Sequence, residues 1–161
     1  MVPGGTWLEL GSGTGAFTLA LADLLGPGGT IHSVDTDSGA LATQAKAVHS
    51  RFDAVRLDQR VADFTRPLGF SGMDGVLMAN SLHFVKNKAP VLALVHGYLK
   101  PDGTFVLVEY DADRGNLWVP HPISFTTWLA VAPTAGFTGT HQLGRVPSRF
   151  LNAIYAAESR T

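Results

Sequence analysis

The feature that most constrains the fold is a glycine-rich turn that follows a short apolar strand near the N-terminus. Residues 8–10 lead into three glycines at every second position, Gly11, Gly13 and Gly15, and a leucine-rich segment follows them. A strand, a turn and a helix start of this kind hold a nucleotide-like ligand over the carboxyl end of a sheet in α/β proteins. Glycines let the backbone approach a ligand closely and adopt positive φ angles. The segment therefore predicts a ligand site.

Acidic and polar residues end the predicted strands that follow. Ile31–Asp35 is a second strand, and its final aspartate stands 24 residues after Gly11. Dinucleotide-binding folds place a carboxylate on the ribose hydroxyls at about this spacing. A third segment ends in Asp63 and Phe64, and a fourth strand leaves Asn80 at its carboxyl end. These positions predict a row of ligand contacts along one edge of a sheet.

Apolar strands alternate with helical patterns along the chain, and this order predicts a parallel sheet with helices on both faces. We expect a third strand near residues 55–61 and a fifth at 105–110, after a turn at 99–104. We expect helices over residues 15–25, 38–51, 89–99 and 124–135. Asp37 is the expected N-cap of the second helix, and Pro133 is expected to kink or end the last one.

These ordered features resemble the class I S-adenosylmethionine (SAM) dependent methyltransferases from Leu8 to about Asp111, with a weaker similarity to Ala157. The Leu-Lys-Pro-Asp-Gly turn at residues 99–103 is similar to the Leu-Lys-Pro-Gly-Gly element of that family, with Asp102 in place of a glycine. The resemblance implies a Rossmann-like, doubly wound α/β fold in a single domain over residues 1–161. Its mostly parallel, seven-stranded sheet would end in an antiparallel hairpin, with strands expected at 137–143 and 150–156.

The resemblance also implies SAM as the cofactor and S-adenosylhomocysteine (SAH) as the product. It places the methionine part of SAM against Glu9 and the turn residues, which are Gly11, Ser12, Gly13 and Gly15. It implies that Asp35, with Thr36, holds the ribose hydroxyls, that Asp63 binds the adenine amino group, and that Phe64 contacts the adenine ring. Asn80 is implied to lie beside the transferred methyl group.

Structural roles remain as alternatives for several of these residues. Asp35 is also a candidate cap of the second helix, and Asp63 is also suited to an Asx turn with its own backbone. Phe64 is as well suited to the core as to the adenine ring. Glu9 is also suited to a solvent-facing position in its strand, although an acid among apolar residues usually has a polar partner.

Two histidines are the candidates for a catalytic base. The methyl group of a sulfonium is already activated, so alignment of the acceptor alone contributes about 7–11 kcal/mol. His83 follows Asn80 by three residues at the carboxyl end of the fourth strand, and an imidazole titrates near neutral pH. His121, flanked by Pro120 and Pro122, is the second candidate. A buried structural histidine and a rigid surface turn are the alternative roles of these two residues.

Composition limits the cofactors and partners. With 12 basic and 13 acidic residues, the chain has no basic footprint for nucleic acid. It also lacks the Asn-Pro-Pro-aromatic signature used for methylating base or amide nitrogens, so a small organic molecule is the predicted acceptor. There is no cysteine, and the six histidines are not closely paired, so no metal site is expected.

The ends and the surface of the chain carry further expectations. No secretory signal and no apolar run of about 18 residues is present, which predicts a cytoplasmic protein without a membrane partner. Only 16% of the residues are charged, which predicts self-association as a homodimer. Only six residues precede Trp7, where the resembled family usually carries helices. An open site, a cover supplied by a partner subunit, and a truncated form are the three explanations.

Three functions remain open at this point. The first is a SAM-dependent methyltransferase acting on a small molecule. The second is a module that binds SAM or SAH without turnover. The third is an NAD-dependent oxidoreductase, because Gly11, Gly13 and Ala16 satisfy the dinucleotide fingerprint, although Glu9 and Gly15 argue against it.

Overall fold

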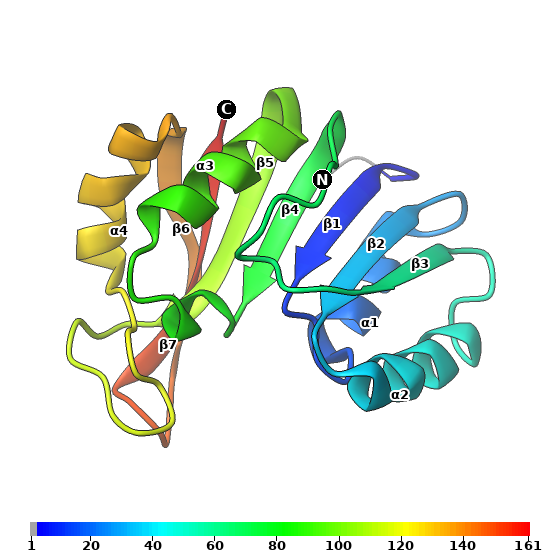
Figure 1. The fold of residues 1–161 in the computed structure, drawn as a ribbon, viewed down its shortest axis with the longest axis horizontal. Coiled ribbons are helices and arrows are strands. Elements are labelled where there is room, and N and C mark those ends of the chain that lie inside the picture. The colour runs from blue at the N-terminus through cyan, green and yellow to red at the C-terminus, as the bar shows by residue number, and fades with distance from the viewer. Residues whose placement is uncertain (1–2) are drawn as a thin grey trace.

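The computed structural model describes residues 3–161, and Figure 1 shows a twisted sheet with helices on both of its faces. The seven strands lie in the order β3-β2-β1-β4-β5-β7-β6. The strands β3, β2, β1, β4 and β5 pair in parallel. Strand β7 lies between β5 and β6 and runs antiparallel to both. The predicted Rossmann-like fold with a C-terminal antiparallel hairpin is therefore confirmed. The strands are β1 Thr6–Leu10, β2 Thr30–Asp35, β3 Arg56–Val61, β4 Met73–Ala79, β5 Leu99–Tyr110, β6 Thr138–Pro147 and β7 Ala153–Arg160.

The helices form the two outer layers. In Figure 1, α3 and α4 lie in front of the sheet and α1 lies behind it. None of the helices formed by residues 3–161 is long and apolar enough to cross a membrane. The helices are α1 Ala16–Leu25, α2 Ser38–His49, α3 Ala89–Tyr98 and α4 Phe125–Val131, and the two 3₁₀ turns are η1 Leu82–Phe84 and η2 Ala132–Ala135.

The two faces of the sheet bury two separate apolar clusters. Successive side chains of a strand point to opposite faces, so Leu8 joins one cluster while Trp7 joins the other. Leu92 of α3 completes the first cluster, and Leu21 of α1 completes the second. By the same alternation Glu9 faces the α1 layer, where it needs a polar partner.

Local sequence signals set the start of α2 and the end of α4. Asp37 caps α2 as predicted, because its Oδ1 accepts hydrogen bonds from the amides of Gly39 and Ala40 at 2.8 and 3.0 Å. The helix predicted over residues 124–135 is α-helical only to Val131. The chain then tightens into η2 around Pro133, which has no N–H to continue the helix.

The C-terminal half differs from the prediction in its boundaries. The turn expected at 99–104 lies within β5, where Asp102 adopts a φ of 60° and the pairing register with β4 shifts. The hairpin strands lie later in the chain than the expected 137–143 and 150–156, and Phe150 is 66% exposed between them. Because β5 begins before Phe105, β7 extends to Arg160 to pair with Thr104.

Candidate functional site

The glycine turn between β1 and α1 is shaped by its surroundings as well as by its φ angles. Gly11, Gly13 and Gly15 have φ angles of 75°, 54° and 94°. A Cβ at Gly11 would lie 2.4 Å from the Cβ of Ser81, and one at Gly15 would lie 2.6 Å from the Cγ of Gln44. No atom lies within 4 Å of a Cβ built on Gly13. The outer two glycines therefore permit close packing, and the middle one keeps the space above the turn open.

A cavity of about 440 Å³ opens beside this turn, at the carboxyl ends of β1, β2 and β4. Its volume lies within the range of about 300–1,000 Å³ that is usual for small-molecule sites. Seven of the ten predicted cofactor residues line it: Gly11, Gly13, Asp35, Thr36, Asp63, Phe64 and Asn80. Four further residues line the cavity and were not among the ten predicted cofactor residues, namely Thr65, Ser81, Phe84 and Val85. Each lies close after a predicted strand-end residue, and that proximity was the available signal.

Asp35 joins the end of β2 to the glycine turn. Its Oδ2 accepts a hydrogen bond from the amide of Gly13 at 2.8 Å, and its Oδ1 accepts one from the amide of Asp37 at 2.9 Å. A carboxylate has about four acceptor sites, so both oxygens keep capacity for hydroxyl groups of a ligand. The alternative role as the cap of α2 belongs to Asp37 instead.

Asp63 and Phe64 each combine a structural and a cavity-lining position. Asp63 Oδ1 accepts hydrogen bonds from the Oγ1 and the amide of Thr65 at 2.7 and 2.8 Å, the Asx turn that was the alternative. These two bonds lower the pKa of Asp63, so the group is an anion at neutral pH. Phe64 lines the cavity and also packs against the apolar cluster under α3.

Asn80 brings a buried side-chain oxygen to the cavity. It follows β4 directly, has a φ of 52°, and donates its amide proton to the carbonyl of Val108 at 2.9 Å. Its Oδ1 is buried and accepts no hydrogen bond from residues 3–161. A buried acceptor left unsatisfied costs about 1–3 kcal/mol. The atom is therefore available to a hydrogen-bond donor in the cavity.

The remaining predicted residues, Glu9, Ser12 and Gly15, lie behind the cavity lining. Glu9 is 1% exposed, and its Oε2 accepts a hydrogen bond from the Oγ1 of Thr18 at 2.5 Å. Burial raises the pKa of Glu9 to about 7, against the opposing effect of this bond. Their contact with the cofactor stays a prediction.

The polar chain below the turn continues into α2. Gln44 Nε2 donates to the Oγ1 of Thr18 at 2.6 Å, and Ser33 Oγ lies 2.9 Å from Gln44 Oε1 and 2.7 Å from Ser12 Oγ. These hydrogen bonds connect the glycine turn to β2, α1 and α2 and so hold the turn in position.

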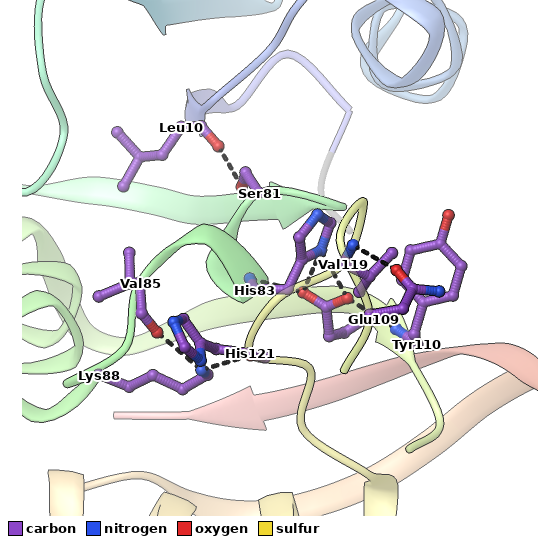
Figure 2. A network of polar contacts seen from close by, with 10 residues as sticks. Leu10, Ser81, His83, Val85, Lys88, Glu109, Tyr110, Val119 and His121 are labelled. Atoms are coloured by element: carbon purple, nitrogen blue, oxygen red, sulfur yellow. Dashed lines mark hydrogen bonds and ion pairs between the residues drawn. The ribbon is translucent and has the colours of Figure 1, made fainter. Parts of the chain in front are cut away.

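A buried histidine and glutamate lie beyond Asn80. His83, in the η1 turn, is 3% exposed, and Glu109, near the end of β5, is 0% exposed. His83 Nδ1 lies 2.9 Å from Oε1 and 3.1 Å from Oε2 of Glu109. The same carboxylate accepts the amides of His83 at 3.0 Å and Tyr110 at 2.7 Å. Figure 2 shows Nδ1 turned to Glu109 and the other ring nitrogen turned away from it.

This arrangement sets the chemistry of the imidazole. A carboxylate at Nδ1 fixes the tautomer with the proton on Nδ1, so Nε2 is the basic nitrogen. Among residues 3–161, Nε2 has no hydrogen-bond partner, and it is not one of the fully enclosed unpartnered atoms. The pair therefore has the geometry of a base oriented by a third group. The sequence pattern gave Glu109 no specific role.

His121 is brought to His83 by its main chain. Its amide donates to the carbonyl of His83 at 3.0 Å, and its carbonyl accepts from the Nζ of Lys88 at 2.7 Å. The cavity lining includes neither His121 nor His83, although Ser81 and Phe84 on either side of His83 do line it. Lys88 Nζ also donates to the carbonyl of Val85 at 2.8 Å. Burial lowers the pKa of Lys88, and the negative charge of Glu109 acts in the opposite direction.

Comparisons with known proteins give the fold and the site a family. The solved structures that match include the 1,6-didemethyltoxoflavin-N1-methyltransferase of Burkholderia thailandensis with bound SAH, which has a TM-score of 0.79 at 20% identity over 99% of this chain and 71% of that one. The CurJ carbon methyltransferase has a TM-score of 0.76 at 21% identity over 98% of this chain and 48% of that one. These likenesses define the α/β fold of class I SAM-dependent methyltransferases.

The sequence itself then decides the family. Residues 8–105 match the family model described as "Methyltransferase domain", so the chain belongs to that family, and its fold is that of the class I SAM-dependent methyltransferases. An alignment that covers 78% of the chain is 31% identical to the lovastatin diketide synthase of Aspergillus terreus. An alignment that covers 85% of the chain is 27% identical to a highly reducing polyketide synthase of Emericella nidulans. The chain spans only 5% and 6% of the length of these two relatives.

The cofactor of this class is SAM, and the cavity fits it. The cavity volume suits a ligand of that size. The carboxylate of Asp35 has free acceptor sites for hydroxyl groups, and the Oδ1 of Asn80, unpartnered among residues 3–161, is available to a hydrogen-bond donor. Residues 3–161 contain no group of three or more acidic or histidine side chains placed to hold a metal ion. Family membership also selects a methyltransferase over the NAD-dependent oxidoreductase.

Proposed function

We propose that this chain transfers the methyl group of SAM to a small organic molecule. The cofactor lies in the cavity, with its ribose at Asp35 and Thr36 and its adenine at Asp63 and Phe64. Its methionine end lies at the glycine turn and Asn80. The observation that carries the proposal is the buried His83–Glu109 pair, in which His83 follows Asn80 by three residues and keeps its Nε2 without a partner among residues 3–161.

His83 is the general base in this proposal. When it is bound, SAM would supply an electrophilic methyl group, whose bond to sulfur breaks in the transfer and leaves SAH. Nε2 of His83 removes the proton of the acceptor as the acceptor atom bonds to the methyl group, and the carboxylate of Glu109 stabilises the resulting imidazolium. The imidazolium then returns its proton to water. A positioned base of this kind contributes typically about 10²- to 10⁴-fold in rate.

A more specific acceptor is a carbon atom of a polyketide-type acyl chain. Two observations favour it: the curated relatives are named as polyketide or diketide synthases, and two of the similar structures are named as carbon methyltransferases. A carbon atom beside a carbonyl group releases its proton less readily than a phenol or a thiol does. A buried, oriented base therefore suits a carbon acid better than an acceptor that ionises by itself.

The surface near the site supports the predicted self-association as a homodimer. Phe84, Leu117 and Trp118 are 65%, 88% and 73% exposed in loops that flank His83. Large apolar side chains in such numbers favour coverage by another surface. Light scattering tests this directly, and a single 17.1 kDa species at roughly tens of micromolar protein would count against it.

Binding and turnover test the function separately. Calorimetry with SAH is expected to give a micromolar dissociation constant, equivalent to about 8 kcal/mol, and calorimetry with NAD no signal. Consumption of SAM is then measured over a panel of β-ketoacyl thioesters, phenols and amines. Turnover supports a methyltransferase, whereas SAH binding without turnover on any acceptor would make the chain a binding module.

Three variants assign the base. His83→Ala and Glu109→Gln are each expected to lower kcat, the first by about 10²- to 10⁴-fold, while SAH affinity stays unchanged. His121→Ala tests the second candidate. A loss in His121→Ala with full activity in His83→Ala would move the base to His121, and full activity in all three would leave alignment as the source of the rate.

A further inference from the structure

Lys88 lies at a junction between the two loops on the acceptor side of the site. Its main chain is fixed at the start of α3, where its carbonyl accepts a hydrogen bond from the amide of Leu92 at 2.9 Å. Its half-buried Nζ reaches back from this position to the carbonyls of Val85 and His121, at 2.8 and 2.7 Å. One ammonium group thus joins the segment that carries His83 to the loop at residues 111–124 (Figure 2).

The contacts of Lys88 belong to a chain of hydrogen bonds around His83. Glu109 accepts the amide proton of His83, and the carbonyl of His83 accepts the amide proton of His121 at 3.0 Å. Lys88 then ties the carbonyl of His121 to that of Val85, which ends the η1 turn. Both main-chain groups of His83 are therefore hydrogen-bonded, its amide to Glu109 and its carbonyl to His121. Lys88 in turn holds His121 through its carbonyl.

The loop at residues 111–124 is anchored by the buried side chains of Val119 and Ile123, but it makes few hydrogen bonds to the segment that carries His83. Its ends are fixed by Asp111, whose Oδ1 accepts the amide of Phe125 at 3.0 Å, and by Asp113, whose Oδ1 accepts the amide of Ser124 at 3.0 Å. Among the described residues, the bonds of His121 to His83 and Lys88 are the hydrogen bonds that join this loop to residues 81–88. Loss of the ammonium would leave a single main-chain bond.

We propose that Lys88 is a positioning residue, which clamps the loop at residues 111–124 onto the η1 turn and so holds His83 in its catalytic orientation. This inference rests on the proposed function, because it assigns a role relative to the base of that reaction. Lys88 reaches the reaction only through main-chain carbonyls. Its two carbonyl acceptors explain why a charged group is kept in a half-buried position, where its pKa is lowered by burial.

The test compares Lys88→Met with Lys86→Met. Methionine keeps much of the length of the side chain and removes its donors, and Lys86 is an exposed lysine two residues earlier that serves as the matched control. Lys88→Met is expected to lower kcat roughly 10- to 100-fold, as a displaced catalytic group does, while the KM for SAM stays within about twofold. Lys88→Arg, which keeps charge and donors, is expected to recover part of kcat. Equal kcat values in Lys88→Met and Lys86→Met would overturn the proposal.

Amide hydrogen exchange gives a readout that needs no turnover. In the wild-type chain the amide of His121 is expected to exchange at least about tenfold more slowly than that of Leu117, an exposed residue of the same loop. The protection of His121 is expected to fall in Lys88→Met and to persist in Lys86→Met. Equal exchange of His121 and Leu117 in the wild type would overturn the clamp even if Lys88→Met does not fold. If the wild-type chain consumes no SAM and the protection of His121 falls in Lys88→Met but not in Lys86→Met, the proposed function is rejected and the clamp is kept.

Discussion

Replacing Asp35 by alanine is expected to weaken cofactor binding much more than replacing Asp37. The carboxylate of Asp35 lines the cavity, and it already orders the turn by accepting the amide proton of Gly13 at 2.8 Å. Asp37 stands two residues later with its carboxylate on the first amides of α2. The two variants therefore remove the same chemical group from neighbouring positions, one facing the cavity and the other capping a helix.

The magnitude follows from the bonds that are lost. A hydrogen bond to a charged acceptor contributes about 1.5–3 kcal/mol, so Asp35→Ala is expected to raise the dissociation constant of SAH about 10- to 150-fold. The partly exposed site favours the lower half of this range, because water competes for the ribose hydroxyls. Asp37→Ala is expected to leave the constant unchanged and to lower the free energy of unfolding by about 1 kcal/mol.

Isothermal calorimetry with SAH and urea unfolding of the same samples measure both quantities. Asp35→Asn separates the charge from the hydrogen-bonding capacity, and it is expected to fall between the wild type and Asp35→Ala. Unchanged SAH affinity in a folded Asp35→Ala would refute the ribose assignment. An equal loss of affinity in Asp37→Ala would show that the effect travels through the stability of α2.

Two further predictions concern the turn and the acid beneath it. A Cβ on Gly11 would lie 2.4 Å from that of Ser81, whereas a Cβ on Gly13 would point into open space. Gly11→Ala is therefore expected to lower Tm more than Gly13→Ala, and Gly13→Ala is expected mainly to weaken SAH binding. Thermal melts and calorimetry on both variants check this order. Burial raises the pKa of Glu9 from 4.5 in the unfolded chain to about 7 in the folded one, so its contribution to stability is complete below pH 4.5 and is lost as the pH rises through 7. This loss amounts to about 3 kcal/mol, and urea unfolding between pH 4 and 8 is expected to show it in the wild type and not in Glu9→Gln.

The sequence by itself determined the parts of this protein that depend on local chain geometry. The positive φ angles at Gly11 and Gly13 and the cap at Asp37 follow from what a few neighbouring residues permit. The order of strands and helices follows from the spacing of apolar residues. Because the carboxyl ends of parallel strands meet at one edge, these local signals also place Asp35, Asp63 and Asn80 around one cavity.

Only the tertiary structure decided which distant groups meet. Glu109 stands 26 residues from His83, and Lys88 stands 33 residues from His121. No local pattern links either pair, since each contact depends on β5 lying next to β4 and on the course of the loop at residues 111–124. The same holds for Gln44, which reaches Thr18 beneath the glycine turn from a different helix. Strand order and register bring these donors and acceptors together, so the oriented base and its clamp are properties of the fold rather than of any segment.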